Sequence, residues 1–97
     1  MTVFLIERNY AEQLEVNPEI AAAVNKINDA AGVQWLISFL SADKKKTYCL
    51  YEAPNAEAIR EAARQAGIPA DSVIEVGEIL PNGLIGAVQP ERFAVSS

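Results

Sequence analysis

Hydrophobic residues fall into four short strand-like runs and two helical stretches along this chain of 97 residues. The runs, residues 3–7, 33–40, 46–52 and 71–79, are rich in β-branched and aromatic residues, which predicts strands. After the first and third runs, apolar residues recur every three or four positions, a spacing typical of helices packed on a core. The pattern predicts the order strand, helix, strand, strand, helix, strand.

Both predicted helices have recognisable ends. Asn17 can cap the first helix and Gly32 can end it. The second helix, residues 56–66, follows Asn55 and closes at Gly67. Together these elements predict an α+β, ferredoxin-like βαββαβ fold, in which two helices cover one face of a four-stranded antiparallel sheet.

The length of the chain suits a single domain. We expect the ferredoxin-like domain to span residues 2–80. Beyond Pro81 the hydrophobic periodicity is lost, so residues 81–97 are predicted to form a tail or arm.

Alternation along the strands divides their side chains between two faces. We expect the helices to cover Phe4, Ile6, Leu36, Leu40, Leu50, Ile74 and Val76. The open face is expected to carry Leu5, Glu7, Trp35, Ile37, Phe39, Cys49, Tyr51 and Glu75. So many large apolar groups are seldom left in water. The sequence therefore predicts a homodimer that covers this face.

Charge restricts the possible partners. Eight basic and thirteen acidic residues give a net charge of −5, which phosphate backbones repel. Residues 46–51 resemble the RNP1 pattern of RNA-binding sheets but lack its glycines. We therefore expect no nucleic-acid partner. No apolar run is long enough for a bilayer, so we also expect no membrane partner and a cytoplasmic location.

The sequence contains no histidine, which excludes Ser-His-Asp and Cys-His nucleophile arrangements. The candidate metal ligands on the open face are Glu7, Cys49 and Glu75, because carboxylates and thiolates bind divalent metals. Cys49 is alternatively a small buried hydrophobe. The aromatic side chains of Trp35, Phe39 and Tyr51 are expected on the same face. They form either a wall around a small ligand or cofactor, or the core of a dimer interface.

Several segments resemble a bacterial family of proteins of unknown function, typified by a small nickel-binding, dimeric, ferredoxin-like protein. The segments are FLIER at 4–8, GVQWLIS at 32–38, DKKKTYCLYEAP at 43–54 and AIREAARQAG at 58–67. The resemblance covers residues 3–79 and is most distinctive at residues 46–54. It implies a homodimer that binds nickel or another divalent metal.

One position departs from this resemblance. The family usually carries a histidine two residues after the tryptophan, where this chain has Ile37. An aliphatic side chain cannot ligate nickel, so the resemblance transfers no metal ligand to this position.

The residues and the resemblance together predict a small dimeric binding protein. Its ligand, a metal ion or small molecule, is expected at the open sheet face. The alternative is a dimeric α+β barrel enzyme, in which Glu7 or Glu75 acts as a carboxylate base in an apolar pocket. A cavity lined by both carboxylates would favour the enzyme.

Overall fold

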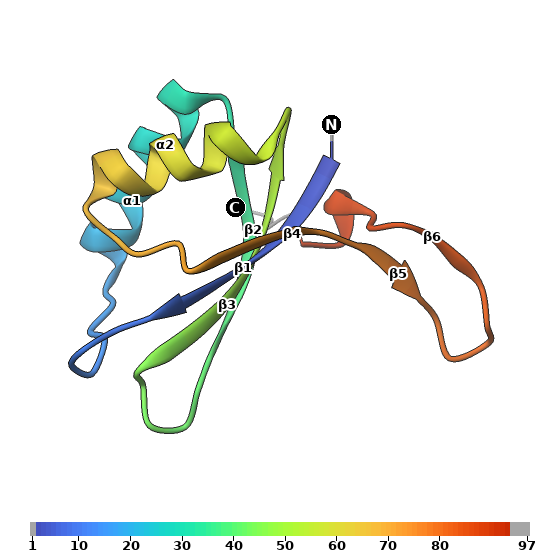
Figure 1. Ribbon diagram of the computed structural model, residues 1–97, viewed down its shortest axis with the longest axis horizontal. Helices are drawn as coiled ribbons and strands as arrows, with labels where there is room; N and C mark the ends of the chain where they lie inside the picture. Colours follow the sequence, from blue (N-terminus) through green and yellow to red (C-terminus); the bar gives the residue numbers. More distant parts are fainter. Residues whose placement is uncertain (1, 94–97) are drawn as a thin grey trace.

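The computed structural model describes residues 2–93 and contains a four-stranded antiparallel sheet (Figure 1). The strands are β1 (Thr2–Asn9), β2 (Gln34–Leu40), β3 (Lys46–Ala53) and β4 (Ser72–Glu75). Their order across the sheet is β2-β3-β1-β4, and every neighbouring pair is antiparallel. The predicted ferredoxin-like arrangement is confirmed.

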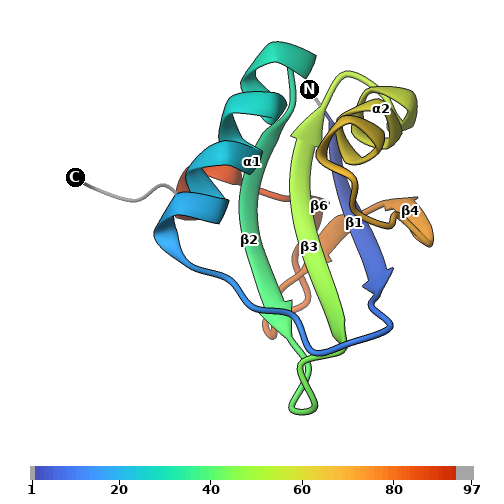
Figure 2. The same cartoon turned by 90° about the vertical axis from the view of Figure 1, so that its left-hand side faces the viewer.

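Two helices, α1 (Pro18–Ala31) and α2 (Ala56–Ala66), cover the same face of this sheet (Figure 2). The predicted caps are present at both N-termini. Asn17 Oδ1 accepts a hydrogen bond from the backbone N–H of Ile20, at 2.9 Å, and Asn55 caps α2 in the same way. Each helix ends at a glycine in the left-handed conformation, which a residue with a side chain adopts less easily. In residues 2–93, no helix is long and apolar enough to span a membrane.

The core lies between the helices and the sheet. Ile6 of β1 and Ile59 of α2 are fully buried at its centre. They pack with a cluster that also contains Phe4, Val33, Cys49, Tyr51, Ala53 and Ala62. Burial of these apolar groups fixes the helices over one side of the sheet.

The strand register corrects part of the predicted division between the two faces. Tyr51 lies opposite Phe4, and Cys49 lies opposite Ile6. The side chains of Tyr51 and Cys49 therefore face the helices and not the open side. Trp35 pairs with Tyr51 and faces the helices as well. The predictions for Trp35, Cys49 and Tyr51 were therefore wrong.

The remaining face corrections concern β3 and β4. Leu50 and Ile74 both pair with Leu5, which places them on the open face and not beneath the helices as predicted. Glu75 lies opposite Phe4, so it leaves the predicted open face for the helix side, where it is exposed at the sheet edge. In β3, both alternating sets of residues contain large apolar side chains, so alternation alone did not identify the buried set.

A β-bulge between Trp35 and Ile37 interrupts the pairing of β2 with β3. An extra residue in one strand breaks the simple alternation of side chains. The bulge lets Trp35 face the helices while Ile37 and Phe39 lie on the open face, in register with Leu50 and Tyr48.

The C-terminal part forms an arm. The segment predicted as one last strand is divided into β4 and β5 (Gly77–Ile79), and β5 pairs with β6 (Ile85–Ala87) in a separate hairpin. Figure 1 shows this hairpin pointing away from the four-stranded sheet. A short 3-10 helix, η1 (Pro90–Phe93), then packs against β2. Residues 94–97 of the predicted tail lie outside the described part.

Candidate functional site

A cavity of about 270 Å³ lies between α1 and the helix-facing side of β2 and β3. We call it the α1 cavity. The segment from Tyr10 to Val16, which links β1 to α1, forms another of its walls. Backbone hydrogen bonds hold this segment to the β2–β3 turn: Tyr10 N–H donates to Lys45 O and Leu14 N–H donates to Lys44 O. The cavity thus brings together residues from the range 8–24, from β2 and from β3, with Ile68 from beyond α2.

Most of the cavity lining is apolar. The apolar and aromatic residues are Tyr10, Leu14, Val16, Ile20, Ala21, Val24, Trp35, Leu40, Tyr51 and Ile68. Val16, Ile20 and Leu40 are each about half exposed, so they border an opening to solvent. Apolar walls with a few convergent polar groups are typical of small-molecule sites.

The polar groups of the cavity lie on its sheet side and are connected by hydrogen bonds. Trp35 Nε1, which can only donate, bonds to Ser38 Oγ at 2.8 Å. Ser38 Oγ in turn donates to Cys49 Sγ at 2.8 Å. The thiol then donates to Thr47 Oγ1 at 3.6 Å, a length acceptable for sulfur. These contacts orient four polar groups along one wall.

Arg8 adds a positive charge to this wall. It extends from β1, lies directly opposite Thr47 of β3, and is only 3% exposed. One guanidinium nitrogen donates to the carbonyl oxygen of Pro69, and the guanidinium carbon lies 5.7 Å from the centre of the Tyr51 ring. Arg8 is thus a buried cation at the edge of an apolar cavity.

Tyr51 connects Arg8 to the tryptophan. Its ring stacks with that of Trp35, with centroids 6.5 Å apart and planes 8° from parallel. Burial raises the pKa of Tyr51 above its usual value, although the positive charge of Arg8 opposes this shift. The phenol therefore stays neutral near pH 7. Of the three predicted ligand-binding aromatic residues, the structure brings these two together and leaves Phe39 on the opposite face.

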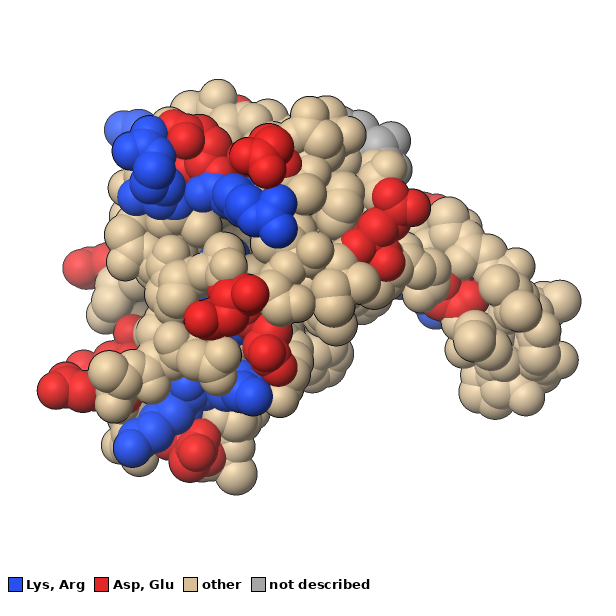
Figure 3. Space-filling model, in the orientation of Figure 1, with Lys and Arg blue, Asp and Glu red and all other residues tan. Residues whose placement is uncertain are grey.

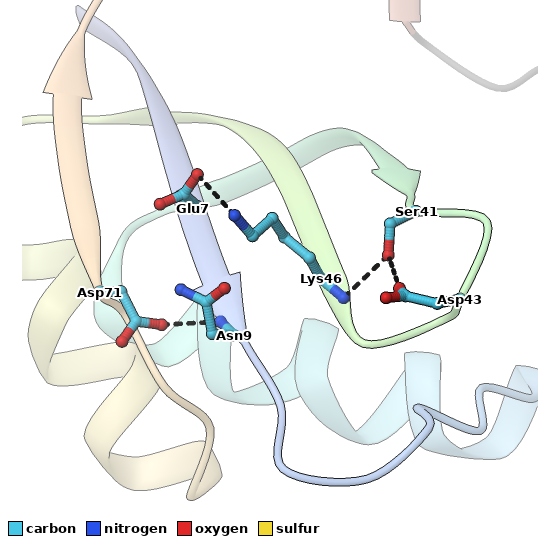
Figure 4. Close-up of polar contacts among 6 residues, drawn as sticks. All are labelled: Glu7, Asn9, Ser41, Asp43, Lys46 and Asp71. Carbon is cyan, nitrogen blue, oxygen red and sulfur yellow. Dashed lines mark hydrogen bonds and ion pairs between the residues drawn. The ribbon is translucent and has the colours of Figure 1, made fainter.

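Glu7, a predicted metal ligand, lies on the open face near the β2–β3 turn (Figure 4). Its carboxylate pairs with Lys46 of the neighbouring strand at 3.4 Å, and this hydrogen bond raises the pKa of Lys46. Ser41 and Asp43 hold the turn beside it: Ser41 Oγ donates to Asp43 Oδ1 and accepts from the backbone N–H of Lys46. Glu7 therefore belongs to a solvent-exposed ion pair.

The three predicted metal ligands do not come together. Glu7 lies on the open face, Cys49 is buried on the helix side, and Glu75 is exposed at the sheet edge. Glu7 and Glu75 are on adjacent strands but three positions out of register, which places them on opposite faces. Within residues 2–93, no three Cys, Asp or Glu side chains are close enough to hold a metal ion. The predicted donors of one subunit therefore form no metal site.

The sequence interpretation missed Arg8, Ser38 and Thr47. For Arg8 a signal was available, because it follows Phe4 and Ile6 at a spacing of two and therefore shares their buried face. Thr47 offered the same kind of signal, because it precedes Cys49 and Tyr51 at a spacing of two. Ser38 gave none, since hydroxyl residues are common on exposed strand faces.

Residues 4–76 match the family described as "Nickel responsive protein SCO4226-like". A crystal structure of SCO4226 from Streptomyces coelicolor A3(2) is similar, with a TM-score of 0.66 and 22% sequence identity. The match covers 76% of this chain and 94% of that chain, and at this identity it supports the fold. No curated protein matches the sequence.

Proposed function

The chain belongs to the nickel-responsive SCO4226-like family, and on that premise we propose that it is a small homodimeric binding protein without catalytic activity. Its ligand is a small apolar molecule held in the α1 cavity. One observation carries this proposal: the cavity combines apolar walls with a connected set of polar groups on one side. Such a set fixes the orientation of a ligand that the apolar walls take out of water.

This proposal moves the ligand from the predicted open face to the helix side. Cys49, Trp35 and Tyr51 all lie there, and so do the polar groups that can orient a ligand. The open face carries Ile37, Leu50, Leu5 and Ile74 in one row across the four strands. A flat aliphatic row suits contact with a second copy better than it suits a small ligand.

A metal ion as the bound ligand is less well supported, although the family is described by its response to nickel. The donors of a single subunit are dispersed, as described above, and the chain has no imidazole. Nickel sites commonly use nitrogen or sulfur donors, and Cys49 provides one donor at most. We therefore propose an organic ligand in this protein.

The enzyme alternative requires a carboxylate base in an apolar pocket. The α1 cavity is lined by fourteen residues of the described chain, and none of them is acidic. Glu7 and Glu75 lie outside the cavity, on opposite faces of the sheet. The cavity therefore favours binding over general-base chemistry.

A titration with 1-octanol, a neutral and mostly apolar probe, tests the proposed function. Chemical shifts of the isotopically labelled protein should change at amides around the cavity, in α1, β2 and β3. Ala21→Phe fills the cavity and should weaken binding at least about tenfold, which corresponds to ~1.4 kcal/mol.

The matched control is Ala22→Phe, which adds the same ring to an exposed position of α1. This variant should bind 1-octanol with the same affinity as the parent protein. Shift changes confined to the open face, or equal effects of the two substitutions, would contradict a ligand site in the cavity.

A further inference from the structure

Arg8 is a buried cation without an acidic ion-pair partner among residues 2–93. The residue is only 3% exposed, and its guanidinium donates to the carbonyl oxygen of Pro69 and not to a carboxylate. Tyr51 does not supply the missing charge, because burial keeps its phenol protonated. A buried cation is usually paired with an anion, since its burial is otherwise unfavourable.

A hydroxyl donor lies beside this charge. The hydrogen bonds along the cavity wall run in one direction, from Trp35 through Ser38 and Cys49 to Thr47. Thr47 Oγ1 accepts the last of them, and no acceptor for its own proton is found in the described part of the chain. Thr47 is 5% exposed and lies directly opposite Arg8 in the register of β1 and β3, so both residues belong to the sheet side of the cavity.

We propose that the ligand of the α1 cavity is an apolar molecule with a single carboxylate, which Arg8 and Thr47 bind. This inference rests on the proposed function. The guanidinium neutralises the carboxylate and donates to it, and the Thr47 hydroxyl donates a further hydrogen bond. The apolar part of the ligand extends between α1 and β2 toward Val16 and Leu40.

The charge balance favours a monoanion over a phosphate. Arg8 is the only charged residue among the fourteen described residues that line the cavity. One carboxylate leaves the buried site neutral, whereas a phosphate dianion would leave an uncompensated negative charge. A planar carboxylate also matches the planar guanidinium.

Octanoate and 1-octanol form a matched pair for the test, because they share the chain length and differ in the charged end. The unaltered protein should bind octanoate about tenfold or more tightly than 1-octanol, measured by the same titration. The net charge of −5 disfavours anions in general, so this preference would report a local site.

Arg8→Gln should remove the preference for octanoate while the protein still binds 1-octanol, and this remaining binding shows that the cavity is intact. Arg8→Lys should retain part of the preference, because it keeps the charge and loses the planar fork. Thr47→Val, which has nearly the same shape, should weaken octanoate binding more than 1-octanol binding, because only the carboxylate accepts the hydrogen bond that the charged site provides.

The possible failures are distinct. If neither compound binds, the proposed function fails and this inference fails with it. If 1-octanol binds as tightly as octanoate, the cavity is a binding site but the assignment of a carboxylate is wrong. A preference for octanoate that persists in Arg8→Gln would overturn the role of Arg8.

Discussion

Cys49 illustrates how burial determines what a side chain can do. Its thiol is 5% exposed, accepts a hydrogen bond from Ser38 and donates one to Thr47. A metal would need the thiolate together with further donors in reach. In this environment the thiol instead links two hydroxyl groups of the cavity wall, so it contributes to the polar side of the α1 cavity.

Because the candidate metal ligands are dispersed, we expect no specific nickel site in one subunit. Nickel titrated into the pure protein should bind no more tightly than to an unrelated acidic protein of similar net charge, as measured by calorimetry. Weak binding to surface carboxylates is expected to remain. Glu7→Gln, Glu75→Gln and Cys49→Ser should each leave it nearly unchanged, because the three residues share no site.

A nickel affinity well above that of the reference protein would contradict this prediction. A loss of such affinity in any one of the three variants would identify a ligand.

The arm of β5 and β6 depends on the close approach of two glycines. A Cβ atom at Gly77 would lie 2.7 Å from the backbone oxygen of Gly86, which is too close for any side chain. Gly86 itself has open space around its own Cβ position. Arg92 of η1 forms an ion pair with Glu78 of β5, which holds the returning chain to the hairpin. The arm begins directly after the last residue that matches the family and lies wholly beyond it.

Gly77→Ala should therefore separate the two strands of the arm, at a local cost of about 1–3 kcal/mol from the steric conflict. Amide hydrogen exchange at residues 77–87 should accelerate, while exchange in β1 and β3 stays slow. Gly86→Ala is the matched control and should preserve protection. Equal exchange in the two variants would show that the contact does not hold the hairpin together.

At the scale of the molecule, apolar surface remains on the open face and on the arm. On the open face, Phe39 and Ile74 are each more than half exposed. Ile74 belongs to the aliphatic row of Ile37, Leu50, Leu5 and Ile74, and Phe39 lies beside it. The arm exposes Ile79, Leu84 and Ile85. Figure 3 shows charged side chains over α2, where Arg60 and Arg64 pair with glutamates, and across the rest of the sheet domain, while the visible face of the outer arm shows none.

A domain of this size buries a limited share of its surface, so association is an efficient way to cover such a face. We expect two copies to meet at the open face. Val3 and Val88 line the same hollow and are each less than 10% exposed, whereas the aliphatic row is left for the partner.

Phe39→Glu should disrupt this dimer, because the carboxylate would be desolvated at the interface and a large ring would be lost. The expected weakening is about 2 kcal/mol or more. Light scattering during gel filtration should give twice the 10.5 kDa of one chain for the parent, and the mass of one chain for the variant. Ala22→Glu, on the outer side of α1, controls for the added charge. A parent protein with the mass of a single chain would refute the dimer.

The sequence by itself determined the two helices, the first three strands and their order, but not the division of residues 71–79 into β4 and β5 or the hairpin that β5 forms with β6. Asparagine caps, glycine stops and the two hydrophobic periods act between residues a few positions apart, so they can be recognised without the fold. Only the tertiary structure decided which face of each strand is buried, because alternation relates residues within a strand and not to the helices. The bulge in β2 and the pairing of β3 with β1 placed Cys49, Trp35 and Tyr51 under α1, away from Glu7. The α1 cavity and the juxtaposition of Arg8 with Thr47 depend on the same long-range pairing, which local sequence patterns do not encode.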